Sequence, residues 1–108
     1  MSSVEQVTKV SDLSPGEMKR VEVAGKVVLL ANADGDLLAL AGECTHAGGP
    51  LDEGFLEHGE IECPWHQGRF NVRSGEVTGP PPLEPLPRYK VWVRGEDVIV
   101  DVGQAPEA

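Results

Sequence analysis

The chain has 108 residues, with 18 acidic against 9 basic side chains and a formal net charge of −9. This length suits one domain with a modest core, and the negative charge disfavours nucleic acid as a partner, because phosphates need a basic face. No apolar run approaches the ~20 residues that cross a bilayer, and the N-terminus lacks the basic and apolar regions of a secretory signal. We therefore expect a cytoplasmic protein without a membrane segment, in which both cysteines stay reduced.

The apolar pattern predicts an all-β domain. Short segments alternate between apolar and polar residues and are separated by turns, and no long segment carries a helical period. Residues 26–31 are a continuous apolar run that suits a buried strand, and residues 32–36 contain an Asp-Gly step that predicts a hairpin turn. Only residues 4–13 depart from the strand pattern, and Ser14-Pro15-Gly16 ends that segment. The predicted strands are 19–23, 26–31, 37–40, 70–72, 76–77, 89–93 and 98–102.

Three stretches fall outside these strands. Residues 43–66 are predicted to be a cluster of long loops, and the proline-rich residues 79–87 a stiff loop, with a ligand for a proline-reading module as the alternative. Residues 103–108 are expected to be a frayed tail. Because the chain has no repeat and no linker, we predict one domain over residues 1–108. Trp92 lies in an alternating strand and is predicted to belong to the core.

Both cysteines and two of the three histidines fall into two short boxes. Cys44 and His46 form C-x-H, and Cys63 and His66 form C-x-x-H. Two thiolates and two imidazoles can hold either a tetrahedral zinc ion or a 2Fe–2S cluster. Zinc sites usually draw one ligand type from each half, whereas here each half supplies one of each, which favours the cluster. The third histidine, His58, lies in a polar stretch that is predicted to be a solvated turn rather than a ligand.

Glycines flank both boxes. Gly48 and Gly49 follow the first box, and Gly68 follows the second. Because glycine has no Cβ, these positions allow backbone N–H groups to approach the sulfurs of a buried anionic cluster.

The two boxes, in CTHAGGPL and CPWHQGRF, resemble the Rieske iron–sulfur domain, and most of all the Rieske-type ferredoxins of bacterial aromatic-ring dioxygenases. The resemblance extends to Leu51 and Gly54 after the first box, to Phe70 and Ser74-Gly75 after the second, and to the proline-rich run that leads into Tyr89. It is strong over residues 36–93, and the flanking strands agree in length.

The resemblance implies a Rieske (ISP-like) β-sandwich that carries a small, loop-rich cluster-binding subdomain at about residues 43–83. It also implies one Rieske-type 2Fe–2S cluster, with Cys44 and Cys63 on one iron and His46 and His66 on the other. The expected function is that of a monomeric electron carrier, not itself an enzyme. It would pass single electrons from a flavin-dependent ferredoxin reductase to the terminal oxygenase of an aromatic dioxygenase. Its acidic surface could steer it toward basic patches on these partners, or could serve only solubility.

Two departures place the chain within that family. High-potential Rieske proteins resemble C-T-H-x-G-C and C-P-C-H-G-S-x-Y, with an extra cysteine in each box that forms a disulfide. Here those positions are Gly49 and Trp65, and the hydroxyl donors that follow the second histidine are replaced by Gly68 and Phe70. A cluster without these donors is expected to have a low reduction potential.

Two alternatives remain open from the sequence. One is a Rieske-like small subunit of an assimilatory nitrite reductase, which would also transfer electrons but within a fixed complex. The other belongs to a different class, a structural zinc-binding interaction domain. The chain shows no nucleophile elbow, no phosphate loop and no catalytic dyad outside the four ligands, so nothing in it points to bond-making catalysis.

Overall fold

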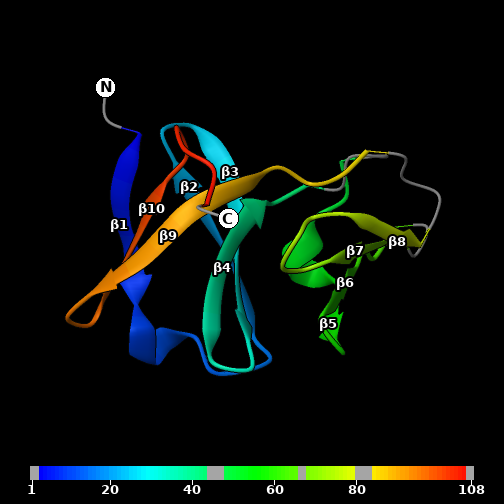
Figure 1. Cartoon of the computed structure of the whole chain (residues 1–108), viewed down its shortest axis with the longest axis horizontal. Coiled ribbons are helices and arrows are strands. Elements are labelled where there is room, and N and C mark those ends of the chain that lie inside the picture. The colour runs from blue at the N-terminus through cyan, green and yellow to red at the C-terminus, as the bar shows by residue number, and fades with distance from the viewer. Residues whose placement is uncertain (1–2, 44–47, 66–67, 80–83, 107–108) are drawn as a thin grey trace.

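A computed structural model describes residues 3–43, 48–65, 68–79 and 84–106 of the chain. Its strands form two antiparallel sheets that lie beside each other along the long axis of the molecule (Figure 1). The predicted all-β, sandwich-like fold class is confirmed. Among the described residues, no helix is long and apolar enough to cross a membrane.

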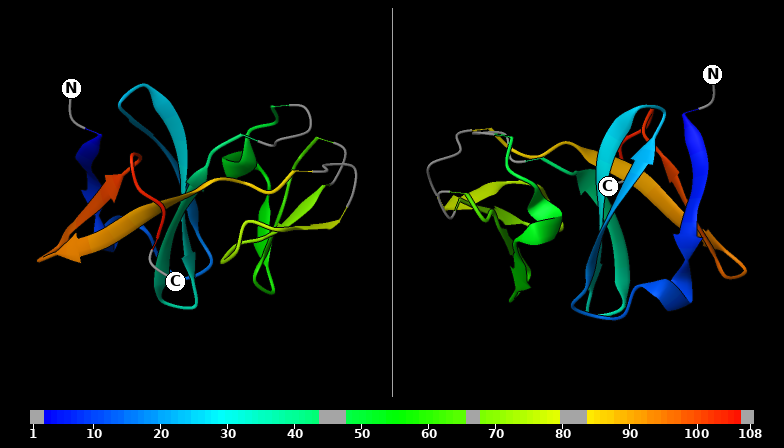
Figure 2. Two further views of the ribbon diagram at one scale, coloured as in Figure 1. Left: turned by 45° about the horizontal axis from the view of Figure 1, so that its top comes forward. Right: turned by 180° about the vertical axis from the view of Figure 1, so that it is seen from behind.

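The larger sheet has six strands in the order β1-β10-β9-β4-β3-β2. It curls strongly, so that its two edge strands approach each other (Figure 2). Side chains join the edges: Lys19 Nζ donates to Thr8 Oγ1 at 2.9 Å, and the Ala24 N–H donates to Glu5 Oε2 at 3.2 Å. The strands are β1 (Val4–Lys9), β2 (Met18–Val23), β3 (Lys26–Ala33), β4 (Asp36–Ala41), β9 (Arg88–Arg94) and β10 (Asp97–Asp101).

The smaller sheet has four strands in the order β5-β6-β7-β8. The predicted hairpin at residues 70–77 is confirmed as its second half, but residues 43–66 are not loops throughout, as the sequence suggested. They contain a short 3-10 helix, η2 (Leu51–Glu53), and two three-residue strands, which the pattern analysis missed because so short a run shows little alternation. The strands are β5 (Phe55–Glu57), β6 (Glu60–Glu62), β7 (Arg69–Asn71) and β8 (Val77–Gly79).

Strand β3 contributes side chains to two cores, one inside the larger sheet and one between the two sheets. Val28 and Leu30 point into a core enclosed by the six-stranded sheet, together with Val98 and Val100. The next residues along β3 face the other way. Leu29 and Ala31 belong to a second core between the sheets, to which β6 and β7 contribute Ile61 and Phe70. The strand is therefore buried on both faces, which accounts for its continuous apolar run.

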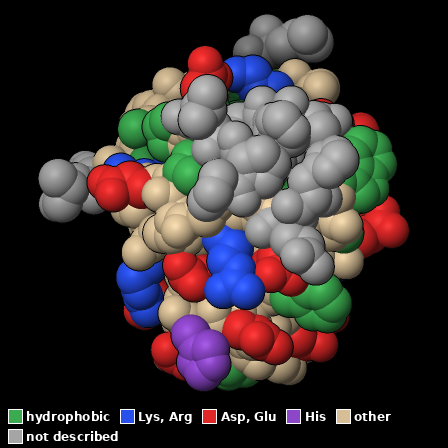
Figure 3. Space-filling model, turned by 90° about the vertical axis from the view of Figure 1, so that its right-hand side faces the viewer, with side chains coloured by type: hydrophobic (Ala, Val, Ile, Leu, Met, Phe, Trp, Pro, Cys, Tyr) green, Lys and Arg blue, Asp and Glu red, His purple; other side chains and the backbone are tan. Residues whose placement is uncertain are grey.

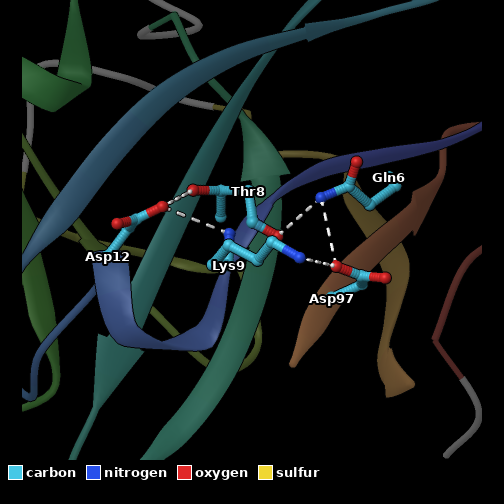
Figure 4. Close-up of polar contacts among 5 residues, drawn as sticks. All are labelled: Gln6, Thr8, Lys9, Asp12 and Asp97. Atoms are coloured by element: carbon cyan, nitrogen blue, oxygen red, sulfur yellow. Dashed lines mark hydrogen bonds and ion pairs between the residues drawn. The ribbon is translucent and has the colours of Figure 1, made fainter. Parts of the chain in front are cut away.

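The N-terminal segment is a strand followed by a 3-10 helix, η1 (Val10–Asp12), although its sequence departed from the strand pattern. β1 is an edge strand that pairs only with β10 and leaves most of its side chains exposed, so its alternation is weak. Polar contacts hold it in place (Figure 4). Lys9 Nζ lies 2.8 Å from Asp97 Oδ1, and this hydrogen bond and charge raise the pKa of Lys9. Thr8 Oγ1 donates to Asp12 Oδ2 at 3.1 Å.

Two-residue turns with positive φ at both positions set the register of three hairpins, at Ala24-Gly25, Asp34-Gly35 and His58-Gly59. The expected Asp-Gly turn is confirmed but is shorter than residues 32–36, because β3 continues to Ala33 and only Asp34 and Gly35 turn, both at positive φ. Positive φ at both central positions is the geometry of a type I′ turn, which matches the twist of the flanking strands. His58 and Gly59 do the same between β5 and β6.

The prediction that Trp92 lies in the core is wrong. Its side chain is only partly buried on β9 and belongs to neither core, and the ammonium group of Lys90 lies 5.5 Å from its ring centroid. Val91, the neighbour that faces the other side of the strand, packs against the core instead.

Candidate metal centre

Cys63 is the one predicted ligand within the described residues, and it lies at the end of β6. Its side chain is fully buried in the core between the two sheets, where Phe70 and Leu51 also lie. The backbone N–H of Trp65 donates to Cys63 Sγ at 3.4 Å. A backbone donor aimed at a sulfur stabilises the thiolate form, which is the form that binds metal.

Gly49, which follows the first ligand box, packs against this sulfur. A Cβ built on Gly49 would lie 2.7 Å from Cys63 Sγ and 3.2 Å from two ring atoms of Trp65. The indole ring therefore rests on the backbone just after the first box while its own backbone N–H contacts the sulfur of the second. Trp65 is still 49% exposed, so one part of its ring packs on Gly49 and the rest of it meets solvent.

Backbone contacts close the base of each box. Glu43 and Pro50 form an antiparallel bridge across residues 44–49, and the Leu51 N–H donates to the Gly42 carbonyl at 3.1 Å. The Cys63 N–H donates to the Gly68 carbonyl at 2.8 Å, which closes the second box. The other three predicted ligands, Cys44, His46 and His66, lie outside the described residues.

The described surroundings fit an anionic sulfur cluster. They supply a buried thiol, a backbone donor to it and a glycine where any side chain would collide with the sulfur. No group of three or more possible metal-binding side chains occurs within the described ranges, which contain one of the four predicted ligands.

Comparison with known proteins decides the family. The family model described as "Rieske [2Fe-2S] domain" matches residues 3–90. The chain belongs to the Rieske [2Fe-2S] domain family. The predicted cofactor, one Rieske-type 2Fe–2S cluster, is therefore confirmed at the level of the family.

Two named relatives of this Rieske chain are ferredoxin components of biphenyl dioxygenases. It is 40% identical over 97 residues to the biphenyl dioxygenase ferredoxin subunit of Pseudomonas sp. (strain KKS102), an alignment that covers 89% of each chain. It is also 40% identical to the ferredoxin component of biphenyl 2,3-dioxygenase from Rhodococcus jostii (strain RHA1), over 84% of this chain and 85% of the relative.

Solved structures agree with these relatives. The ferredoxin of carbazole 1,9a-dioxygenase from Nocardioides aromaticivorans IC177 superposes with a TM-score of 0.86 at 34% identity, over 98% of this chain and 100% of the other. A chain from a complex of reduced oxygenase and oxidized ferredoxin in carbazole 1,9a-dioxygenase gives a TM-score of 0.89 at 31% identity, over 100% of both chains. A putative nitrite reductase small subunit gives a TM-score of 0.72 at 20% identity, over 90% of this chain and 96% of the other, a likeness that shows the fold alone.

His58 lies where the sequence placed it, in an exposed turn of the Rieske domain. Its backbone has φ 52°, and it joins β5 to β6 at the end of the hairpin away from Cys63. The prediction of a solvated turn is confirmed.

The structure adds two residues that the sequence analysis overlooked. Phe55 begins β5 and is 59% exposed, and Arg69 on β7 forms ion pairs with two glutamates of β6. A hairpin signal was available, because the apolar residues of 55–56 and 61 flank a His-Gly step. It would have placed Phe55 on a hairpin that leads into Cys63, whereas the position of Arg69 on β7 needed the tertiary structure.

Replacing Gly49 by alanine is expected to disturb the cluster far more than replacing its neighbour Gly48. The methyl group of an alanine at position 49 would meet Cys63 Sγ. A Cβ at position 48 would meet nothing within 4 Å, so that substitution adds only the backbone strain of a residue with a φ of 71°. Forcing a methyl group into packed surroundings costs about 1–3 kcal/mol. Iron content and the visible spectrum of purified Gly49→Ala and Gly48→Ala protein measure the difference. Equal loss of iron in both variants would contradict the steric explanation.

Proposed function

We propose that the chain is a Rieske ferredoxin that carries single electrons from a flavin-dependent ferredoxin reductase to the terminal oxygenase of a multicomponent aromatic dioxygenase. The observation that carries this proposal is the near full-length similarity to ferredoxin components of biphenyl dioxygenases, together with the thiolate-stabilising surroundings of Cys63. The aromatic compound is selected in the oxygenase, so the same electron carrier is compatible with several substrates.

The proposed ligands are Cys44 and Cys63 for one iron and His46 and His66 for the other. Bound there, the cluster supplies a one-electron redox couple. The protein's part is to hold the thiolate of Cys63 in the core and to pack Trp65 on Gly49 beside it. We further propose that residues 1–108 are one domain, in which residues 43–83 form the cluster-binding subdomain.

We propose that the protein works in the cytoplasm, with protein partners rather than nucleic acid. The cytoplasm keeps thiols reduced and so suits ligands that must bind as thiolates. An acidic chain is a poor partner for nucleic acid and a good one for basic protein surfaces. We propose that it acts as a monomer, since a carrier that visits two enzymes in turn must release each of them.

The two alternatives are weaker. Likeness to the putative nitrite reductase small subunit lies at 20% identity and concerns the fold alone. A structural zinc site would draw on the same four ligands, but the family is that of a 2Fe–2S domain.

Reconstitution tests the proposed function. Purified protein should contain two irons and two acid-labile sulfides per chain, as a 2Fe–2S cluster requires, and should take up one electron. Mixed with NADH, a flavin-dependent ferredoxin reductase and the terminal oxygenase of an aromatic dioxygenase, it should make product formation depend on its own concentration. Stoichiometric zinc without labile sulfide would contradict the cofactor. Turnover that proceeds equally well without the chain, or electron delivery only to a nitrite reductase, would contradict the carrier role.

A further inference from the structure

The outer face of β5, β6 and β7 is hollowed and acidic. A depression of about 250 Å3 is lined by Phe55, Glu57, His58, Glu60, Glu62 and Arg69, which we call the β5–β7 hollow. Figure 3 shows acidic side chains on either side of a basic one on this end of the molecule, with a histidine at the lower edge. Three carboxylates face one guanidinium, so the hollow is negative overall.

Phe55 supplies an apolar surface inside this charged rim. It is 59% exposed, the highest exposure among the large hydrophobic side chains that stand out from the described surface. An exposed aromatic side chain surrounded by charged residues is the usual anatomy of a protein docking site, in which the ring anchors and the charges steer.

The ion pairs of Arg69 indicate that the carboxylates of the hollow can bind a cationic side chain. Its guanidinium lies 3.0 Å from Glu62 Oε1 and 3.8 Å from Glu60 Oε1, with half of its side chain exposed. These exposed ion pairs are weak, so a cation from outside can share or replace them at little cost. No ion pair to Glu57 occurs among the described residues, so its carboxylate remains available to a partner.

One end of the hollow, at Phe55 and Glu62, leads toward the metal centre. Phe55 pairs with Glu62 across β5 and β6, and Glu62 directly precedes Cys63. A partner seated on Phe55 would therefore lie over the end of the hairpin that leads into Cys63, on the opposite face of the sheet from the buried sulfur. The β9–β10 turn, by contrast, lies at the opposite end of the molecule (Figure 1).

We propose that the β5–β7 hollow is a docking site for a lysine or arginine side chain on the electron-accepting face of the terminal oxygenase. The partner's charged head would lie among Glu57, Glu60 and Glu62, and its aliphatic stem would lie on the Phe55 ring. This inference rests on the proposed function and adds to it the surface used and the chemistry of the residue that recognises it.

Opposite changes of charge within the hollow test the inference. The measurement is the second-order rate of electron transfer from reduced protein to the oxygenase that accepts electrons from the wild-type chain. At low ionic strength, Glu57→Gln and Glu60→Gln should each slow the reaction about two- to fivefold, and Arg69→Gln should accelerate it by a similar factor. Raising the ionic strength to about 0.15 M, where the Debye length is ~8 Å, should shrink all three differences. Phe55→Ser should weaken binding of the two proteins about tenfold with little change in salt dependence.

Glu96→Gln is the matched control. It removes one negative charge from the exposed β9–β10 turn, so it changes the net charge as Glu60→Gln does but leaves the hollow intact. Visible spectra and reduction potentials equal to wild type would show that each variant still holds its cluster.

The possible failures can be told apart. If wild-type protein delivers electrons to no oxygenase, the proposed function is wrong and the docking site falls with it. If wild-type protein is active but Glu60→Gln, Arg69→Gln and Glu96→Gln react alike, the inference alone is overturned. Acceleration by Glu60→Gln would overturn it as well, because the oxygenase would then present acidic rather than basic groups.

Discussion

Changing His46 or His66 to alanine is expected to remove the cluster, whereas changing His58 to alanine is expected to leave it in place. The first two histidines are the proposed ligands of one iron, and loss of either opens its coordination. His58 lies in the exposed turn between β5 and β6, away from Cys63. Iron and labile sulfide per chain should fall from two to near zero in the first two variants and stay at two in the third.

Stability gives a second measurement of the same prediction. A domain of 108 residues has a limited core, so binding of a metal cofactor contributes to the free energy of folding. The midpoint of thermal unfolding should fall for His46→Ala, His66→Ala and Cys63→Ser, and stay within a few degrees of wild type for His58→Ala. Full iron in His66→Ala, or loss of iron in His58→Ala, would contradict the assignment of the ligands.

The reduction potential should lie near the lower limit of the Rieske range, which spans about −150 to +300 mV. A donor to the cluster sulfurs favours the reduced state because that state carries the extra negative charge. Hydrogen bonds to charged groups contribute about 1.5–3 kcal/mol, of which we take ~1–2 kcal/mol to be the strengthening on reduction. Each missing hydroxyl then lowers a one-electron potential by about 40–90 mV.

Restoring the hydroxyl groups tests this account. Both positions are buried, and Phe70 is fully enclosed in the core that contains Cys63. Gly68→Ser combined with Phe70→Tyr should raise the potential by about 80–180 mV, measured by redox titration of protein with an intact visible spectrum. The single variants should each give about half of the shift. A native potential well above zero, or a downward shift in the double variant, would mean that another term, such as exposure of the cluster, dominates.

The sequence alone was sufficient for the family, the fold class and the proposed ligands. Two boxes that each combine one cysteine and one histidine are rare in other metal sites, because coordination chemistry restricts both the residue types and their spacing. The strands of the larger sheet were also predictable wherever a strand is long and buried. β3 is the clearest case, since contact with a core on each face produces its unbroken apolar run.

Short and edge strands needed the tertiary structure. β1 pairs along one side only and exposes most of its side chains, and β5 and β6 have three residues each, so none of them shows a clear alternation. Trp92 had the pattern of a core residue, but the direction in which β9 faces the core is decided by its neighbours β4 and β10. Local pattern cannot contain that information, because burial depends on residues far away in the chain.

The surroundings of the candidate centre were likewise decided by tertiary structure. The sequence indicated that Gly49 and Trp65 replace the cysteines of a disulfide, but only the fold shows the Trp65 ring resting on Gly49 beside Cys63 Sγ. Phe55, Glu60 and Arg69 are separated in the sequence and become one acidic hollow when β5, β6 and β7 pair. Ligand identity follows from the chemistry of single residues, whereas the surface that a partner meets follows from how distant segments come together.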